Sequence, residues 1–434
     1  STIKPYLYTL AMENGFSPCD QVRHVEQTLI TETGEAWTPR NANNKRYGEM
    51  VTLKWGLANS DNWISAYLMG KLNPYNLVRL IHSFGVRNKA IDPVVSLCLG
   101  PCEISVGEMV SAYTAFANKG IRVAPLFVTR IEDSDGNVLS TFAPQMEEVI
   151  SVSSAYKMLV MLRSVINEGT GGRVRRYGIT ADMGGKTGTT NNETDKWFCG
   201  FTPYYTASIW LGYDDNSKVL SKSISHTKIW QTIMSQIHEG LSTGEFTQPS
   251  GIVTAQVCSQ SGKLAVAGLC DEDPRGSQVI TEYFSADNVP TEECDTHVKV
   301  TICNDSGDVA SAGCTNTSTR VYIKKSSSGT ASDEESSYSA YDSSYAITDE
   351  KLSRLCSLHN GSNASAVKPG SQTTEASQAA TTPSNTAGTT AANNNGTNGN
   401  TSNTTGTSAA HNNNQSSSAA QNPTTASQNW NTAE

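Results

Sequence analysis

The first 245 residues are predicted to form an α+β fold, because two kinds of periodicity alternate along them. Apolar residues recur at helical spacing in several stretches, and turn-bounded stretches typical of antiparallel strands lie between these. Helices interleaved with hairpins favour layers in which helices cover a sheet. Cysteine spacing and composition divide the remaining sequence into a small module, a linker and a tail.

The expected helices can be placed in chain order. Residues 1–13 form the first, because Pro5 is tolerated in a first turn and Asn14-Gly15 ends the helix. Four further apolar stripes predict helices, each following a turn or preceding a glycine: 63–69, 106–116, 155–166 and 229–237.

Two stretches between the helices predict strand pairs. Residues 121–142 form a hairpin that turns at Asp135-Gly136, a dipeptide typical of tight turns. Residues 197–214 form two strands joined at Pro203.

Residues 250–323 contain an internal repeat, predicted to be a small β module. Cys258 to Cys270 is echoed by Cys303 to Cys314, each copy with a Ser-Gly turn and a glycine near its second cysteine. Disulfides worth about 2–3 kcal/mol each, or free thiols, are favoured there. Cys294 and His297 have a zinc-ligand spacing, but without a second tight pair we predict no metal and no cofactor.

The C-terminal residues are predicted to be unstructured. A linker is expected at 324–360, because residues 325–345 are Ser-rich and acidic. Residues 361–434 consist almost entirely of Ser, Thr, Asn, Ala, Gln and Gly. Such a tail buries too little apolar surface to offset chain entropy, so it should be disordered.

Charge and hydropathy argue against two kinds of interaction: binding of nucleic acid, and crossing of a membrane by a helix of this chain. The 32 Lys and Arg residues against 41 Asp and Glu give a net charge of −9, which argues against nucleic acid as the main partner. No stretch approaches the roughly 18 apolar residues of a membrane helix, and no signal peptide opens the chain.

Three short motifs carry the candidate chemistry. Ser1 and Lys4 lie one helical turn apart, so the amine of Lys4 can reach the hydroxyl of Ser1. The alternative without function is that both side chains lie at a solvent-exposed helix end. Ser60-Asp-Asn62 precedes a helical run, and by itself is best explained as an N-cap. Lys186-Thr-Gly188 with Thr189 suits a strand edge that binds a carboxylate-ended peptide, or is a glycine-rich turn. A phosphate loop also needs a glycine five residues before Gly185, and none stands there.

Together, in this order, the three motifs resemble the signature of penicillin-binding proteins and class A β-lactamases. The wider sequence resembles the transpeptidase domain of bifunctional (class A) penicillin-binding proteins over about residues 1–245. The likeness rests on these segments: 1–5, 107–118, 185–190 and 195–198. It implies a serine β-lactamase/transpeptidase-like antiparallel sheet with a helical lobe.

The resemblance also implies roles in D,D-transpeptidation of peptidoglycan stem peptides, with β-lactams trapping the nucleophile. Ser1 would attack the penultimate carbonyl, Lys4 would accept its proton, Ser60 would relay a proton to D-alanine, and Asn62 would orient Lys4. The terminal carboxylate would be held by Lys186, Thr187 and Thr189, beside Gly188. Backbone N–H groups of Ser1 and Thr189 would form the oxyanion hole.

Several alternatives remain open. A D,D-carboxypeptidase is possible, whereas a class A β-lactamase needs a water-activating glutamate, and no Glu-x-x-Asn segment lies between Asn62 and Lys186. An N-terminal-nucleophile hydrolase would use the α-amine of Ser1 as base, but leaves Lys4 unexplained. A non-catalytic wall-binding protein would work through its cysteine repeat and tail.

The position of the nucleophile at residue 1 departs from the family, in which a sheet strand, a transglycosylase domain and a membrane helix lie upstream. We therefore expect a fragment, poorly active alone, from the extracytoplasmic face of a bacterial membrane, with membrane contact only through a missing upstream anchor.

Overall fold

The structure is a computed structural model that describes residues 1–42, 44–177, 179–219, 225–325 and 344–359. Helices and antiparallel strands interleave along the first 245 residues, which confirms the predicted α+β class. The predicted tail, 361–434, and most of the Ser-rich stretch lie outside the described residues. No described helix combines the length and apolar character that a membrane crossing requires.

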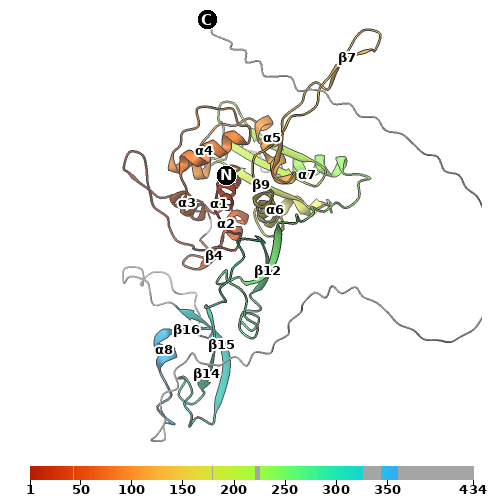
Figure 1. Cartoon of the computed structure of the whole chain (residues 1–434). Helices are drawn as coiled ribbons and strands as arrows, with labels where there is room; N and C mark the ends of the chain where they lie inside the picture. The colour runs from red at the N-terminus through yellow and green to blue at the C-terminus, as the bar shows by residue number, and fades with distance from the viewer. Residues whose placement is uncertain (43, 178, 220–224, 326–343, 360–434) are drawn as a thin grey trace, which may run out of the picture. The chain divides into compact units, whose positions relative to one another are not determined.

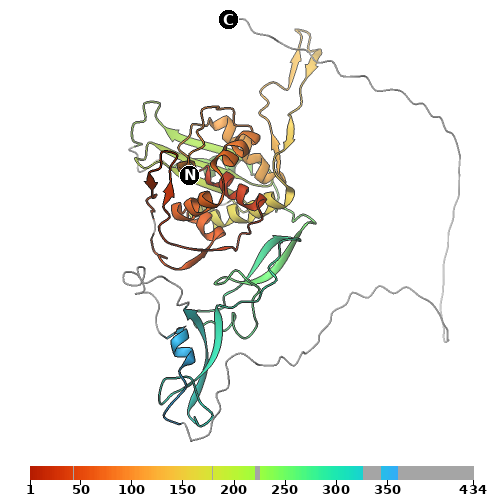
Figure 2. The ribbon, with the colours of Figure 1, turned by 60° about the vertical axis from the view of Figure 1, so that its left-hand side comes forward.

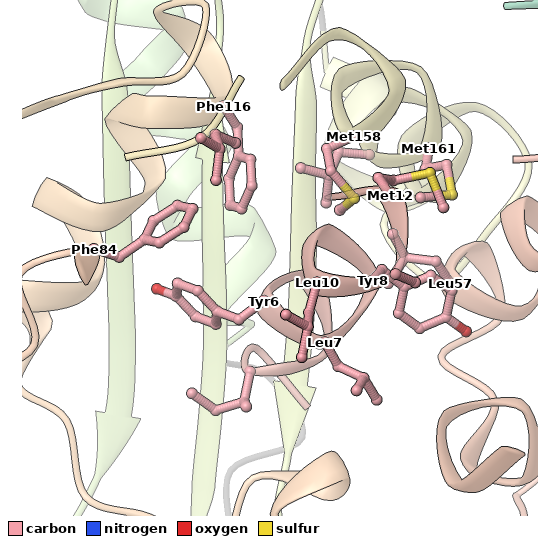
Figure 3. Packing of buried hydrophobic residues seen from close by; sticks show 14 of the residues in the cluster. Tyr6, Leu7, Tyr8, Leu10, Met12, Leu57, Phe84, Phe116, Met158 and Met161 are labelled. Carbon is pink, nitrogen blue, oxygen red and sulfur yellow. The ribbon is translucent and has the colours of Figure 1, made fainter. Parts of the chain in front are cut away.

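The first 245 residues are called the first body below. Helix α1 (Lys4–Glu13) lies at its centre. All of its residues from Lys4 to Met12 are buried, as expected of a helix that is surrounded by others instead of facing solvent on one side. Figure 3 shows Tyr6 facing Phe84 on one side of the helix, while Met158 lies on the other. The rings of Tyr6 and Phe84 meet edge to face at 5.0 Å. The start of this helix is therefore not the solvent-exposed helix end considered as the alternative interpretation of Ser1 and Lys4.

Four other helices of the first body confirm the predicted stripes: α3 (Asn62–Lys71), α5 (Val106–Ala117), α6 (Val152–Asn167) and α7 (His226–Ile237). The sequence analysis did not foresee the remaining helical elements: α2 (Leu53–Ala58), α4 (Pro74–Ser83), η1 (Val95–Leu99) and η2 (Gly172–Tyr177). Helices α2, α3, α4 and α6 pack on α1, whereas α7 packs on the sheet.

Three antiparallel strands form the main sheet, in the order β11 (Thr206–Gly212), β10 (Asp195–Phe201), β9 (Gly184–Thr189). Alternate residues of β10 point to opposite faces. Cys199 belongs to the core cluster of α1, α5 and α6, whereas Phe198 packs on Trp230 of α7 with ring centroids 5.0 Å apart. The sheet thus lies between helices, and β9 is an outer strand among the described residues (Figure 1). The strand pair predicted at 197–214 is confirmed.

Four short strand pairs complete the first body: β1 (Gln21–Arg23) with β4 (Met50–Thr52), β2 (Leu29–Ile30) with β3 (Ala36–Trp37), β5 (Ile121–Val123) with β8 (Met146–Glu148), and β6 (Arg130–Glu132) with β7 (Val138–Thr141). The turn predicted at Asp135-Gly136 joins β6 to β7, and Gly136 has a left-handed φ of 84°. The prediction of one hairpin over 121–142 is wrong at its start, because β5 pairs with β8. Both views show the β6–β7 hairpin extending from the helices (Figures 1 and 2).

Two small sheets follow. Strand β12 (Ile252–Cys258) pairs with β13 (Val279–Ser285), and β14 (His297–Cys303) pairs with β15 (Thr317–Lys325). Strand β16 (Ala346–Thr348) joins β15 in parallel and leads into α8 (Asp349–Ser353), so the predicted linker contains folded elements of the second repeat. All ten cysteines are described, and none is joined in a disulfide in the structure.

Candidate active site

A cavity of about 1250 Å³ brings the three motifs together. Six of the eight predicted site residues line it: Ser1, Ser60, Asn62, Thr187, Gly188 and Thr189. The other two, Lys4 and Lys186, are fully buried and donate hydrogen bonds to residues of this lining. Three segments far apart in the sequence therefore bring several hydroxyls, two amines and an amide to one site.

Lys4 connects the first motif to the second. Its Nζ donates to the carbonyl of Ser60 at 2.6 Å, to the carbonyl of Asp61 at 3.1 Å, and to Asn62 Oδ1 at 2.6 Å. These are the three bonds that an ammonium can donate. Burial is the largest influence on the pKa of Lys4 and lowers it to about 8, although the Asp61 carboxylate opposes this shift. A substantial fraction of Lys4 is therefore neutral near pH 8.

The second motif is both a helix cap and part of the cavity lining. Asp61 is the N-cap of α3, and its Oδ1 accepts from the N–H of Ile64 at 3.0 Å. The residues on either side of this cap, Ser60 and Asn62, line the cavity. The helix cap predicted from the sequence thus fixes the positions of the Ser60 and Asn62 side chains.

Ser60 is held in an unusual backbone conformation. Its φ is 56°, in the left-handed region that non-glycine residues seldom adopt. In this conformation its Oγ accepts a 2.8 Å hydrogen bond from Lys186 Nζ, which links the second motif to the third. Non-glycine strain at a cavity wall is a common property of functional sites.

Two substitutions distinguish the contribution of the Ser60 backbone conformation to stability from that of its hydroxyl. Ser60→Ala and Ser60→Gly both remove the bond to Lys186, but only glycine adopts this φ without strain. We expect the glycine variant to be the more stable by about 1 kcal/mol in urea unfolding. Equal stability of the two variants would contradict the inference that the backbone of Ser60 is strained.

The third motif lies on β9, whose other neighbour is the start of α1. A Cβ added at Gly188 would lie 3.1 Å from Thr2 Cγ2 and 3.2 Å from Trp197 Cβ, so a larger residue there would require these neighbours to shift. Thr187 Oγ1 lies 2.8 Å from Thr170 Oγ1, a residue that the sequence analysis did not select. The Ser1 nitrogen donates to the carbonyl of Leu99 at 3.1 Å.

Protonating two buried lysines in one site costs free energy, because burial and mutual repulsion both disfavour the charged amines. Burial, and after it the positive charge of Lys4, lowers the pKa of Lys186 well below its ordinary value. An anion entering the cavity would reverse this effect, since an opposite charge nearby favours the protonated amine. The site is therefore prepared to take up a carboxylate together with a proton.

A segment before α2 supports the second motif and was missed. Asn62 donates through Nδ2 to the carbonyl of Arg40 at 2.6 Å, and its N–H donates to Asn41 Oδ1 at 3.0 Å. Asn41 and His24 also contact the Asp61 carboxylate, at 2.6 and 2.8 Å. No local pattern around residues 24 or 41 signals this role, because the contacts depend on the tertiary fold.

Carboxylates are scarce in this cavity. Among its described lining residues, only Glu103 and Asp195 carry one. Glu103 is exposed, and Asp195 accepts from the indole N–H of Trp210 at 2.9 Å. Neither is a buried base close to the lysine pair.

The comparisons with known proteins agree with the motifs. Residues 1–235, more than half of the chain, match the family described as penicillin binding protein transpeptidase domain, and residues 248–299 match the penicillin-binding protein 1A C-terminal domain. Penicillin-binding protein 1A of Clostridium novyi (strain NT) is 32% identical over 338 residues, which cover 76% of this chain and 38% of the relative. The same-named protein of Aquifex aeolicus (strain VF5) is 34% identical over 230 residues, covering 53% and 31%.

Two solved structures show the same fold. Penicillin-binding protein 1A from Haemophilus influenzae has a TM-score of 0.61 at 24% identity and covers 68% of this chain and 48% of its own. The PonA1 protein from Mycobacterium tuberculosis, solved with penicillin V, has a TM-score of 0.51 at 23% identity, with coverage of 58% and 71%. The chain spans about 38% of the length of the Clostridium novyi relative. The resemblance inferred from three short motifs is confirmed, and the chain belongs to the penicillin-binding protein transpeptidase family.

Proposed function

We propose that the cavity is the active site of a peptidoglycan D,D-transpeptidase, a serine acyltransferase whose nucleophile is Ser1. The observation that carries this proposal is the chain of contacts from Lys4 through Asn62 and Ser60 to Lys186, at the wall that Ser1 also lines. A serine hydroxyl becomes nucleophilic when a base removes its proton, and a partly neutral buried lysine meets that need.

Acylation proceeds in a balanced sequence. Neutral Lys4 accepts the proton of Ser1 Oγ as the oxygen bonds to the penultimate carbonyl carbon of a stem peptide. The bond to the terminal D-alanine then breaks, and its nitrogen takes a proton from Ser60, which Lys186 replaces. Asn62 holds the amine of Lys4 in place throughout.

The third motif binds the end of the substrate. The terminal carboxylate is held by Lys186, which becomes protonated beside it, and by the hydroxyls of Thr187 and Thr189. Gly188 leaves room for the substrate backbone. The N–H of Thr189, with the Ser1 nitrogen, stabilises the oxyanion, and one such donor is typically worth about 10²–10³ in rate.

Transfer to an amine is favoured over hydrolysis. Water needs a base to attack the acyl-enzyme, and the carboxylates of the described lining are an exposed Glu103 and an Asp195 committed to Trp210. An amine on a neighbouring stem peptide then attacks the acyl carbonyl and gives one proton through Ser60 to neutral Lys186, while the Ser1 oxygen leaves with the proton held by Lys4. A D,D-carboxypeptidase reaction remains the alternative outcome at the same intermediate.

The N-terminal-nucleophile alternative is less well supported. Burial and the neighbouring Lys4 lower the pKa of a free Ser1 α-amine to about 4. A general base works best when its pKa is near the working pH, which favours Lys4 at about 8. We place the reaction on the extracytoplasmic face of a bacterial membrane, where peptidoglycan is cross-linked.

Intact-mass spectrometry after penicillin treatment tests the proposal. We expect one covalent adduct per chain, located on Ser1 by peptide mapping, and no adduct on Ser1→Ala. The two proteins are compared at equal concentration as the 434-residue chain. An adduct that persists on the alanine variant would show that the nucleophile is another residue.

A further inference from the structure

Eight metal-binding side chains gather in two clusters outside the active site. The first contains Cys258, Cys270, Cys294 and His297; the second contains Cys303, Cys314, Cys356 and His359. Within each cluster all four donor atoms lie within 4.8 Å of one another. We propose that each cluster binds one structural Zn²⁺ through three thiolates and one imidazole.

The spacing of the donor atoms fits a tetrahedral ion. His297 Nδ1 lies 3.5 Å from Cys258 Sγ and 3.4 Å from Cys294 Sγ. Zinc–sulfur bonds of about 2.3 Å and zinc–nitrogen bonds of about 2.0–2.1 Å at a tetrahedral angle separate sulfur from nitrogen by roughly 3.5 Å. The imidazole already stands where a zinc ligand would.

The second cluster repeats this geometry around its own histidine. His359 Nδ1 lies 3.3 Å from Cys303 Sγ, 3.5 Å from Cys314 Sγ and 3.4 Å from Cys356 Sγ. One imidazole nitrogen thus faces all three sulfurs, an arrangement that a common central ion explains.

Groups around the ligands are also those of a zinc site. His297 Nε2 lies 2.8 Å from the buried carboxylate of Asp273, and His359 Nε2 lies 3.5 Å from Asp305. A carboxylate behind the ligating histidine fixes the ring orientation and directs the other nitrogen at the metal. Backbone N–H groups also donate to sulfur, from Val266 to Cys270 at 3.3 Å and in the second cluster from Ser311 at 3.3 Å.

The two clusters are built by equivalent segments. Strands β12 and β14 end at Cys258 and Cys303, and in each case a glycine four residues later donates its N–H to that cysteine's carbonyl at 2.8 Å. The third cysteine then pairs back onto this turn: the N–H of Cys294 donates to Leu264 at 2.8 Å, and that of Cys356 to Val309 at 2.7 Å. Two independent copies of one ligand geometry are poorly explained by chance.

Disulfides explain these clusters less well than zinc. Each contains three cysteines, so one disulfide would leave a thiol unpaired and the histidine without a role. Thiolate and imidazole donors select zinc over the oxygen-seeking Mg²⁺ and Ca²⁺, and four protein ligands close the site to catalysis. The ion would bind together segments up to 56 residues apart, as the contact of Cys303 with His359 illustrates.

Elemental analysis of the chain, purified under reducing conditions without chelator, tests the proposal. We expect two zinc ions per chain for the unmodified protein. Cys294→Ser and Cys356→Ser should each retain one, and the double variant none. Cys102→Ser, which changes a thiol outside both clusters, is the matched control and should retain two.

A cobalt titration of the unmodified chain, after a chelator has removed its zinc under reducing conditions, makes the result independent of how the variants fold. We expect thiolate-to-cobalt charge-transfer absorption and intense visible bands of a tetrahedral ion, saturating at two equivalents. The proposal is overturned if the spectrum is that of octahedral cobalt or shows no thiolate band. It is equally overturned if the reduced chain contains no stoichiometric zinc while its thiols react freely.

Discussion

Replacing Lys4 with methionine is expected to lower the rate of penicillin acylation by about 10²–10⁴, the usual contribution of a general base. Methionine preserves the length and the apolar part of the side chain but offers no proton acceptor. Lys4→Arg should be as inactive, because a guanidinium stays protonated at any working pH. The measurement is the second-order rate constant of adduct formation, followed by mass.

The pH dependence of the wild-type rate gives a second test of Lys4. Since burial lowers the pKa of Lys4 to about 8, the neutral fraction, and with it the acylation rate, should rise about tenfold between pH 7 and pH 9. The direction follows from the role: the base form is the deprotonated one. A rate that falls over this interval would sink the assignment of Lys4 as base.

Lys157 offers a matched control for the loss of a buried amine. It is 2% exposed, lies on α6, and donates to the carbonyls of Met12 at 3.2 Å and Phe16 at 3.3 Å, and it does not line the cavity. Lys157→Met should therefore lower stability while leaving the acylation rate within a factor of about two to three. A large loss of acylation in this variant would mean that the Lys4 result reflects general destabilisation.

The sequence was sufficient to predict which residues share the site, but not how they are held. Ser1, Ser60 and Lys186 were selected because their motifs occur together; Ser1 and Ser60 line one cavity, and the buried Lys186 donates a hydrogen bond to Ser60. Nothing local showed that Lys4 is buried, because the apolar residues of α1 spread around the whole helix instead of forming one stripe. Contacts such as Asn62 with Arg40 depend on tertiary packing and have no local signal.

The cysteine clusters show a different limit of the sequence analysis. It found no second tight ligand pair beside Cys294 and His297, yet Cys356-Ser-Leu-His359 repeats the spacing of Cys294-Asp-Thr-His297. The signal was present but lay beyond the assumed end of the repeat, in a stretch assigned to a linker by its Ser-rich composition. Pairing of β16 with β15 returns this segment to the module.

Asp61 should carry the largest stability effect in the first body. Its side chain is almost fully buried, and its carboxylate contacts His24 Nε2 at 2.8 Å, Asn41 Nδ2 at 2.6 Å and the N–H of Ile64 at 3.0 Å. Asp61→Ala removes the carboxylate that accepts these three bonds and removes the cap of α3. We expect a loss of about 3–5 kcal/mol in urea unfolding, followed by tryptophan fluorescence, since Trp55 and Trp63 pack on His24.

An exposed cap provides the control for this substitution. Asn73 caps α4 through a single 2.8 Å bond from the N–H of Tyr75, so Asn73→Ala should lose only about 1 kcal/mol. Equal losses of unfolding free energy in the two variants would show that Asp61 stabilises the protein only as a helix cap. They would contradict the inference that its buried hydrogen bonds support Ser60 and Asn62.

Acid should weaken the Asp61 network in a predictable direction. Burial favours the neutral acid, but hydrogen bonds from His24, Ile64 and Asn41 outweigh it and lower the pKa of Asp61. The unfolded chain, with a value near about 3.9, then binds more protons than the folded one, so this contribution is complete above that pH and is lost as the pH falls through the lower folded value. The stability difference between wild type and Asp61→Asn should therefore shrink on acidification, because asparagine cannot titrate. A difference that is constant from pH 6 to the acid limit of folding would show that ionised Asp61 does not stabilise the loop that carries Ser60.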